Sequence, residues 1–121
     1  SGSAISLTTA TATDITSISL TAGSWDITGV GCFVPDGTTT VTTLIAWTSP
    51  TSATLPTAPG SGNQIRQGYA GVAQGNVTLC LPFGPTRVNL ASTTTEYISA
   101  RAAFAVANMT SYGYVRATRV R

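Results

Sequence analysis

Few side chains in this 121-residue sequence can carry acid–base or nucleophilic chemistry. There is no His and no Lys, and the four carboxylates are Asp14, Asp26, Asp36 and Glu96. Glycoside hydrolysis needs two carboxylates on either side of one bond, and no two of these residues share a motif. A Ser or Cys nucleophile would have no His to act as its base. The sequence therefore predicts a protein that is not an enzyme.

The sequence also offers little to a metal ion or a cofactor. Two cysteines without a His cannot complete the coordination shell of zinc. Four scattered acids are few for the roughly six to eight oxygen ligands that calcium takes. No glycine-rich phosphate loop is present. We therefore expect no metal and no cofactor.

The positive charge of the chain is small and comes from arginine alone. The formal net charge is +2, and charged residues make up 8% of the chain, against roughly 25% in ordinary domains. Three of the six arginines, Arg116, Arg119 and Arg121, fall within the last six residues. Nucleic-acid binders carry a broader basic surface with aromatic residues between the charges. We therefore expect no nucleic-acid partner, and arginines that pair with carboxylates or lie at a subunit contact.

The two cysteines, Cys32 and Cys80, each lie in an apolar strand-like segment. Two cysteines do not make a disulfide framework in a domain of this length. Buried free thiols are the default expectation. A single disulfide remains open if the two strands prove to be neighbours.

Apolar and polar residues alternate with a period of two through most of the chain, which is typical of half-buried strands. The expected strands are Ile5–Thr8, Ile15–Leu20, Trp25–Val34, Thr39–Thr48, Ile65–Val72, Asn76–Leu81, Arg87–Leu90, Thr94–Val106 and Ser111–Arg121. About eight or nine strands at this spacing predict an all-β antiparallel sandwich or barrel. Gly29 and Gly31 on one strand face are expected to make room for a ring or to mark a bulge.

One domain is expected over residues 4–121. Residues 1–3 have the composition of a linker end or an expression scar, so the chain is expected to be a piece of a longer protein. No apolar run approaches the roughly 18 residues that span a bilayer, so membrane insertion is not expected.

A first candidate site flanks the longest irregular stretch, Ser49–Gly62, which is rich in Pro, Gly, Ser and Thr. Such loops often carry binding functions, although an ordinary surface excursion is equally compatible. Trp47 precedes this loop, and Arg66 and Tyr69 follow it. An aromatic platform with planar donors suits a glycan, so these three residues are the expected ligand-binding site. Trp47 has a second interpretation, as a core residue.

A second candidate surface lies on the last strand. Tyr112, Tyr114 and Arg116 alternate with Gly113 and Val115, so the first three share one face. If Val115 points into the domain, the two tyrosines and Arg116 point outward. Tyr and Arg are enriched at protein interfaces, so these residues are the expected subunit interface.

Three segments of the chain resemble a known family. Thr16–Gly29 looks like the "sIsLtaGdWdvsG" segment of C-terminal domains of phage and prophage tail-fibre proteins. Tyr112–Arg121 is similar to their "yGyirArRvR" terminus, and Thr95–Ala100 resembles their "ttvYLvAqa" strand. The likeness runs from about Ile5 to Arg121 in the same order. A more distant likeness is to the trimeric jelly rolls related to tumour necrosis factor and C1q.

The resemblance implies a homotrimeric jelly-roll domain at the tip of a virion fibre. Such domains seed trimer assembly, bind host surface polysaccharide, or do both, and they contact other virion proteins. The family pattern is structural and transfers no catalytic residue. Localisation in the virion, after synthesis in the host cytoplasm, follows from the same resemblance.

Two other functions remain open from the sequence. A capsid decoration or head-fibre protein would bind the virion instead of the host, and the cysteine pair, which is not a family feature, leaves this choice open. A cellular lectin or adhesin domain is the second, and there a calcium ion or a disulfide would be expected more often.

Overall fold

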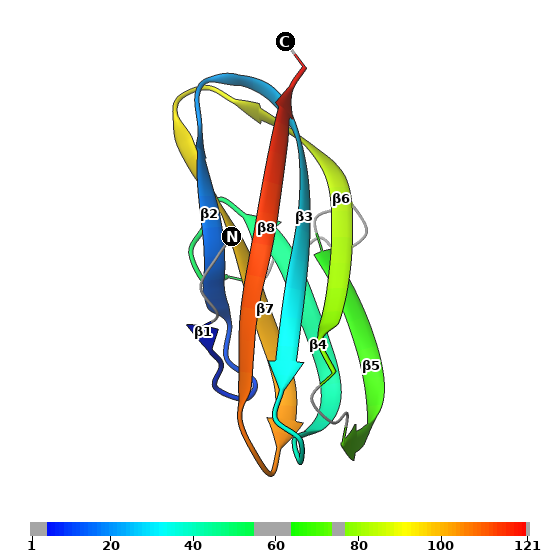
Figure 1. Cartoon of the computed structure of the whole chain (residues 1–121). Helices are drawn as coiled ribbons and strands as arrows, with labels where there is room; N and C mark the ends of the chain where they lie inside the picture. Colours follow the sequence, from blue (N-terminus) through cyan, green and yellow to red (C-terminus); the bar gives the residue numbers. More distant parts are fainter. Residues whose placement is uncertain (1–4, 55–63, 74–76, 121) are drawn as a thin grey trace.

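The computed structural model describes residues 5–54, 64–73 and 77–120, and all regular structure in these residues is β-strand (Figure 1). The strands are β1 (Ile5–Ser6), β2 (Thr13–Leu20), β3 (Gly23–Pro35), β4 (Thr40–Ser49), β5 (Gln64–Ala73), β6 (Leu79–Leu90), β7 (Thr94–Ala105) and β8 (Met109–Arg119). The predicted linker at residues 1–3, most of the predicted loop Ser49–Gly62 and the terminal Arg121 lie outside the described residues.

The strands form two four-stranded antiparallel sheets packed face to face, which confirms the predicted all-β sandwich (Figure 1). One sheet has the order β1-β8-β3-β6, and we call it the β8 sheet. The other has the order β2-β7-β4-β5, and we call it the β4 sheet. Strands from the two ends of the chain are neighbours in both sheets, because β1 pairs with β8 and β2 pairs with β7.

The core lies between the sheets and follows the alternation in the sequence. Phe33, Leu44 and Ile98 are completely buried there. Gly29 also faces the core, and a Cβ at this position would come within 2.6 Å of the Phe83 ring. The expectation that a glycine on this strand makes room for a ring is therefore confirmed.

The sequence predicted two short strands, Asn76–Leu81 and Arg87–Leu90, and the break between them at Gly84 and Pro85 is wrong. A single strand, β6, continues through these residues. Its pairing with β3 shifts register between Ile27 and Gly29, so Gly84 and Pro85 form a bulge. Gly84 has a φ of 97°, a conformation that glycine adopts without steric cost. A bulge kinks a strand locally without ending the ladder, which explains eight described strands in place of nine.

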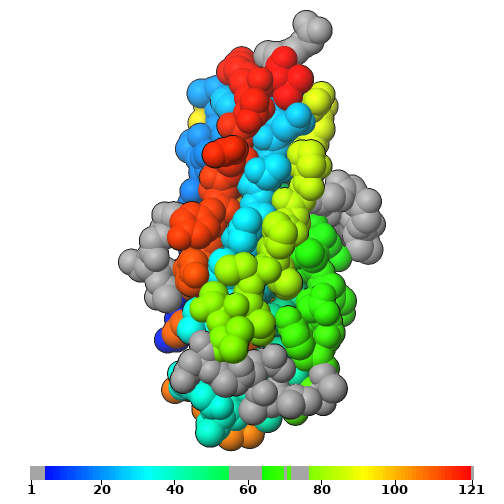
Figure 2. Space-filling model, turned by 45° about the vertical axis from the view of Figure 1, so that its right-hand side comes forward, coloured from blue at the N-terminus to red at the C-terminus, as the bar shows by residue number. Residues whose placement is uncertain are grey.

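The default expectation of free thiols is also wrong, because Cys32 and Cys80 form a disulfide. The two residues are directly opposite each other on the neighbouring strands β3 and β6, with their Cα atoms 4.0 Å apart. Phe33 faces the core, so its neighbour Cys32 faces the other way. The disulfide therefore lies on the outer face of the β8 sheet. Figure 2 shows this outer face, with β3 between β8 and β6.

Candidate functional site

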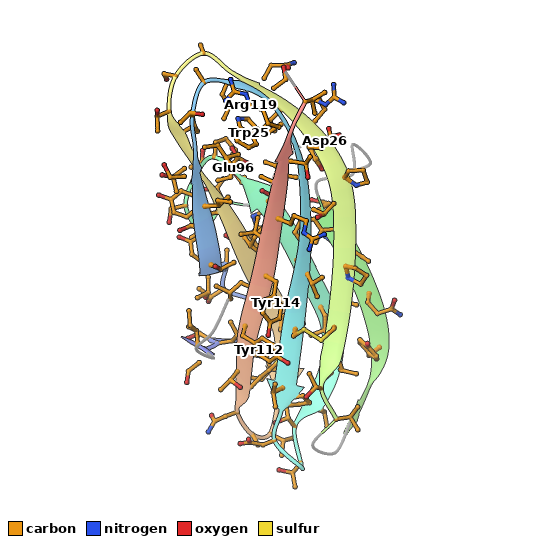
Figure 3. The ribbon with its side chains drawn as sticks, turned by 45° about the horizontal axis from the view of Figure 1, so that its top comes forward. Trp25, Asp26, Glu96, Tyr112, Tyr114 and Arg119 are labelled. Atoms are coloured by element: carbon orange, nitrogen blue, oxygen red, sulfur yellow. A yellow bond between two sulfur atoms is a disulfide. The ribbon has the colours of Figure 1, made fainter. Side chains whose placement is uncertain are left out.

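The outer face of the β8 sheet carries the predicted interface residues Tyr112, Tyr114 and Arg116, which we call the tyrosine strip. Tyr112 lies opposite the outward-facing Cys32 in the β3–β8 ladder, so all three strip residues point outward as predicted. The two tyrosine rings meet edge to face, with centroids 6.0 Å apart (Figure 3). Tyr114 is 53% exposed, so a large aromatic surface faces solvent.

A trough of about 760 Å³ runs along β3 beside the tyrosine strip. Its lining comes from three adjacent strands and comprises Thr28, Gly29, Val30, Pro82, Phe83, Gly84, Tyr114, Val115 and Arg116. Val30 and Thr28 form the floor, because β3 lies between the other two strands (Figure 2). Tyr114 and Arg116 stand on one side and Pro82 on the other. This surface offers an aromatic ring, a guanidinium and a hydroxyl, but none of the described lining residues is an acid.

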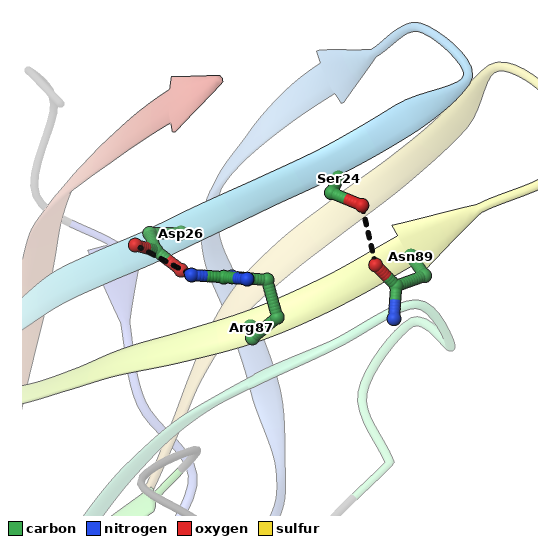
Figure 4. A network of polar contacts seen from close by, with 4 residues as sticks. All are labelled: Ser24, Asp26, Arg87 and Asn89. Carbon is green, nitrogen blue, oxygen red and sulfur yellow. Dashed lines mark hydrogen bonds and ion pairs between the residues drawn. The ribbon is translucent and has the colours of Figure 1, made fainter. Parts of the chain in front are cut away.

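Polar pairs cross from β3 to β6 farther along the same face (Figure 4). The Arg87 Nε donates to Asp26 Oδ1 over 2.5 Å, and the Ser24 hydroxyl donates to Asn89 Oδ1 over 2.5 Å. The hydrogen bond to Asp26, together with its charge, raises the pKa of Arg87. The predicted pairing of an arginine with a carboxylate is therefore confirmed for Arg87. Both partners are exposed, so the pair contributes little to stability.

Another arginine at this end of the β8 sheet has no carboxylate partner in the described residues. The Arg119 guanidinium lies 5.4 Å from the centre of the Trp25 ring. It also donates to the Thr21 hydroxyl and to the carbonyl oxygen of Ala22. Figure 3 shows Trp25 and Arg119 together at the end of the sandwich where β8 finishes. These contacts occupy Arg119 within the chain.

The three residues of the predicted glycan site do not form one surface. Arg66 is exposed and points away from the core, because it lies opposite the outward-facing Ile45. Tyr69 is partly buried and packs against the core between the sheets. Trp47 is completely buried. Trp47 is therefore a buried residue in this structure and not an open aromatic platform.

Trp47 is nevertheless not part of the cluster between the two sheets. It lies opposite Ser99, next to the core residue Ile98, and therefore on the outer face of the β4 sheet. Asp14 on β2 accepts hydrogen bonds from the Ser99 hydroxyl and from the backbone N–H of Ala53. The chain leaving β4 must cross β7 to reach Asp14, so it returns over this face beside Trp47.

Sequence reasoning missed Arg101, the residue that joins Arg66 across β4. Arg101 on β7 and Arg66 on β5 both lie opposite Ile45 in their ladders with β4. The two arginines line one depression of about 140 Å³ on the outer face of the β4 sheet. They are 35 residues apart in sequence, and only the order β7-β4-β5 places them on either side of one residue.

The pKa values of two carboxyl groups are shifted in opposite directions. Burial raises the pKa of Glu96, and the hydrogen bond from the Thr48 hydroxyl offsets part of this effect. Burial would also raise the pKa of Asp14, but hydrogen bonds from Ser52, Ser99 and Ala53 outweigh it and lower the pKa. The two groups lie on opposite faces of the β4 sheet, because Glu96 shares a strand face with the core residue Ile98 and Asp14 lies opposite the outward-facing Ser99.

No group of three or more His, Cys, Asp or Glu residues that could hold a metal ion occurs in the residues that the structure describes. Those residues also contain no helix long and apolar enough to cross a membrane.

Comparison with known proteins adds no family assignment. No protein-family model matches the chain, and no curated protein matches it.

Proposed function

We propose that this chain is a structural domain of a bacteriophage fibre tip that assembles as a homotrimer and attaches to a glycan on the host surface. The proposal begins from the sequence resemblance to phage tail-fibre domains. The strand order supports it, because sheets ordered β1-β8-β3-β6 and β2-β7-β4-β5 are those of an eight-stranded jelly roll. The domain is proposed to act by binding, without catalysis.

The observation that carries the assembly part of the proposal is the exposed tyrosine strip. Tyr114 leaves 53% of its surface in solvent beside a trough with an apolar floor at Val30. Aromatic residues and Arg are enriched in interfaces, and a few such residues supply most of the binding energy. Second copies of this chain are the proposed occupants of this face. The low charge of the chain agrees with a contact from which water is excluded.

The assembly part is tested by light scattering over a range of concentrations. The expected mass is about three times the 12.3 kDa of one chain. Tyr114→Ala is expected to weaken association by about 30-fold, the effect of losing one interface hot spot. Val106→Asn is the matched control, because Val106 is 77% exposed in the β7–β8 turn, outside the tyrosine strip. A wild-type chain that stays monomeric at every concentration would overturn this part.

The receptor part is tested separately, by binding of the fluorescently labelled domain to bacterial cells and to purified capsids. Binding to cells that a surface polysaccharide extract inhibits is the expected result. Binding to capsids without binding to cells would instead favour a decoration or head-fibre protein.

One observation favours a second candidate, a lectin or adhesin domain of cellular origin. Cys32 and Cys80 form a disulfide, and disulfides persist in oxidising, extracellular surroundings. A monomer that binds neutral glycans on an array, and loses that binding with a chelator, would support this candidate over the fibre domain.

A further inference from the structure

Two arginines on the outer face of the β4 sheet face one depression from opposite sides. Arg66 and Arg101 stand on the strands that flank β4, and Ile45 lies between them. Ile45 is 4% exposed although it points away from the core. The stems of the two arginines flank this apolar residue, as long basic side chains commonly do while their charged ends stay wet.

No carboxylate in the described part of the chain neutralises this arginine pair. The one ion pair among those residues joins Arg87 and Asp26 on the other sheet. Neither the Arg66 side chain nor the Arg101 side chain has a hydrogen bond or an ion pair within the part that the structure describes. Two cations beside one depression repel each other, and an anion bound between them would turn this repulsion into attraction.

The depression has space for a small anionic group. Its remaining lining consists of small side chains, Ala10, Thr43 and Ala103, around a volume of about 140 Å³. Beyond Thr43 the surface stays open, because Gly68 lies opposite it and a Cβ at Gly68 would meet nothing within 4 Å. The Thr43 hydroxyl adds a neutral hydrogen-bond donor to the two guanidinium groups.

We propose that Arg66 and Arg101 form a binding site for an anionic group with two or more oxygen atoms, a carboxylate or a phosphate, carried on an acidic glycan. The planar guanidinium donates two parallel hydrogen bonds to such groups, which gives both affinity and geometry. The glycan as carrier rests on the proposed function. The anion site itself rests only on the arginine pair and its depression.

The site is tested with the full chain by titration calorimetry and by NMR of the arginine Nε–Hε groups at low ionic strength. Glucuronic acid oligosaccharides and mannose 6-phosphate are the two anionic probes, and a neutral glucose oligosaccharide is the negative probe. At least one anionic probe is expected to bind and to shift the Hε signals of Arg66 and Arg101. The preferred probe distinguishes a uronic acid from a sugar phosphate. Affinity is expected to fall as salt rises, because exposed charges are screened.

Variants of equal charge separate a specific site from a general attraction. Arg66→Gln and Arg101→Gln are each expected to weaken binding about tenfold or more, the effect of losing a charged hydrogen-bond donor. Arg87→Gln is the matched control, because it removes the same charge on the other sheet, and it is expected to retain affinity. Equal loss in all three variants would overturn the proposal, as would a folded wild-type chain that binds neither anionic probe.

A further variant blocks the site while keeping both arginines. A side chain at Gly68 would extend into open space on the same face as Arg66. Gly68→Glu is therefore expected to fold and to place a carboxylate of the chain itself beside the arginine pair. The anionic probes are then expected to lose affinity about tenfold or more, because the carboxylate competes for the guanidinium groups. Unchanged affinity in a folded Gly68→Glu variant would contradict the site. None of these measurements depends on a trimer or on host cells, so failure of the proposed function would leave them interpretable.

Discussion

Strand β4 in one sheet and strand β8 in the other differ in how far their outward-facing side chains are buried. In β4, the six residues from Leu44 to Ser49 are all buried, whichever way they point. In β8, burial falls off along the strand, and Tyr114 is exposed between partly or fully buried neighbours. The β4 sheet is therefore covered on both faces near Trp47, while no segment among residues 5–54, 64–73 and 77–120 covers the outer face of the β8 sheet at Tyr114.

The difference has a local cause in each sheet. The chain that leaves β4 is fastened to Asp14 by Ser52 and Ala53, so it returns over the outer face of its own sheet. The outer face of the β8 sheet has no such covering segment in the described residues, and Tyr114 and Arg116 border an open trough instead. The covered face therefore contributes stability, whereas the open face leaves the tyrosine strip in contact with solvent.

The largest expected effect is the loss of the covered aromatic residue. Trp47→Ala should lower the free energy of unfolding by about 3–5 kcal/mol, because it removes a completely buried ring and leaves a cavity. Urea denaturation measures this change. Trp47→Phe is the matched variant and should lower the free energy of unfolding less, because the Phe ring keeps much of the volume. The change also removes no hydrogen bond, since the Trp47 Nε1 has no partner among the described residues. An unchanged free energy of unfolding in Trp47→Ala would mean that the outer face of the β4 sheet is open at this position.

Removal of the disulfide tests how much the Cys32–Cys80 bond on the outer face of the β8 sheet contributes to stability. The bond closes a sequence separation of 48 residues, and the double variant Cys32→Ala, Cys80→Ala should lose about 2–4 kcal/mol. Thermal unfolding with and without a reducing agent measures the loss, and the double variant should no longer respond to reduction. If the wild type unfolds at the same temperature in both conditions, the disulfide does not stabilise the β8 sheet.

The smallest expected effect is on how folding stability depends on pH, and it has opposite signs for Asp14 and Glu96. The pKa of Asp14 is lowered from its ordinary value of 3.8, so its contribution is present above that pH and is lost as pH falls through the folded-state pKa. Asp14→Asn should therefore destabilise the protein at neutral pH, and its effect should shrink in acid. Equal destabilisation at pH 7 and pH 2 would show that the carboxylate charge plays no part in holding the returning chain.

Glu96 should show the reverse. The pKa of Glu96 is raised from its ordinary value of 4.5, so ionisation costs stability as pH rises from that value through the folded-state pKa. Glu96→Gln keeps an oxygen for the Thr48 hydroxyl and should raise stability at neutral pH but not in acid. Denaturation midpoints measured across pH give the test, and destabilisation at neutral pH would contradict the assigned cost of burying this carboxylate.

Sequence reasoning predicted the strands and the facing of single residues better than it predicted sites. Tyr112, Tyr114 and Arg116 point outward as expected, because alternation is a property of one strand. The expected ligand site joined residues that are close in sequence, and the structure does not bring them onto one surface. Arg66 and Tyr69 are three residues apart on β5, so alternation places them on opposite sides of their sheet.

The sequence by itself determined the all-β class and the outward face of the last strand, since both follow from local alternation and turn residues. Only the tertiary structure decided that Cys32 meets Cys80, that Arg101 joins Arg66 across Ile45, and that Trp47 is buried on an outer face. The physical reason is that strand order and register bring together residues far apart in the chain. Periodicity within one strand contains no information about which strands become its neighbours.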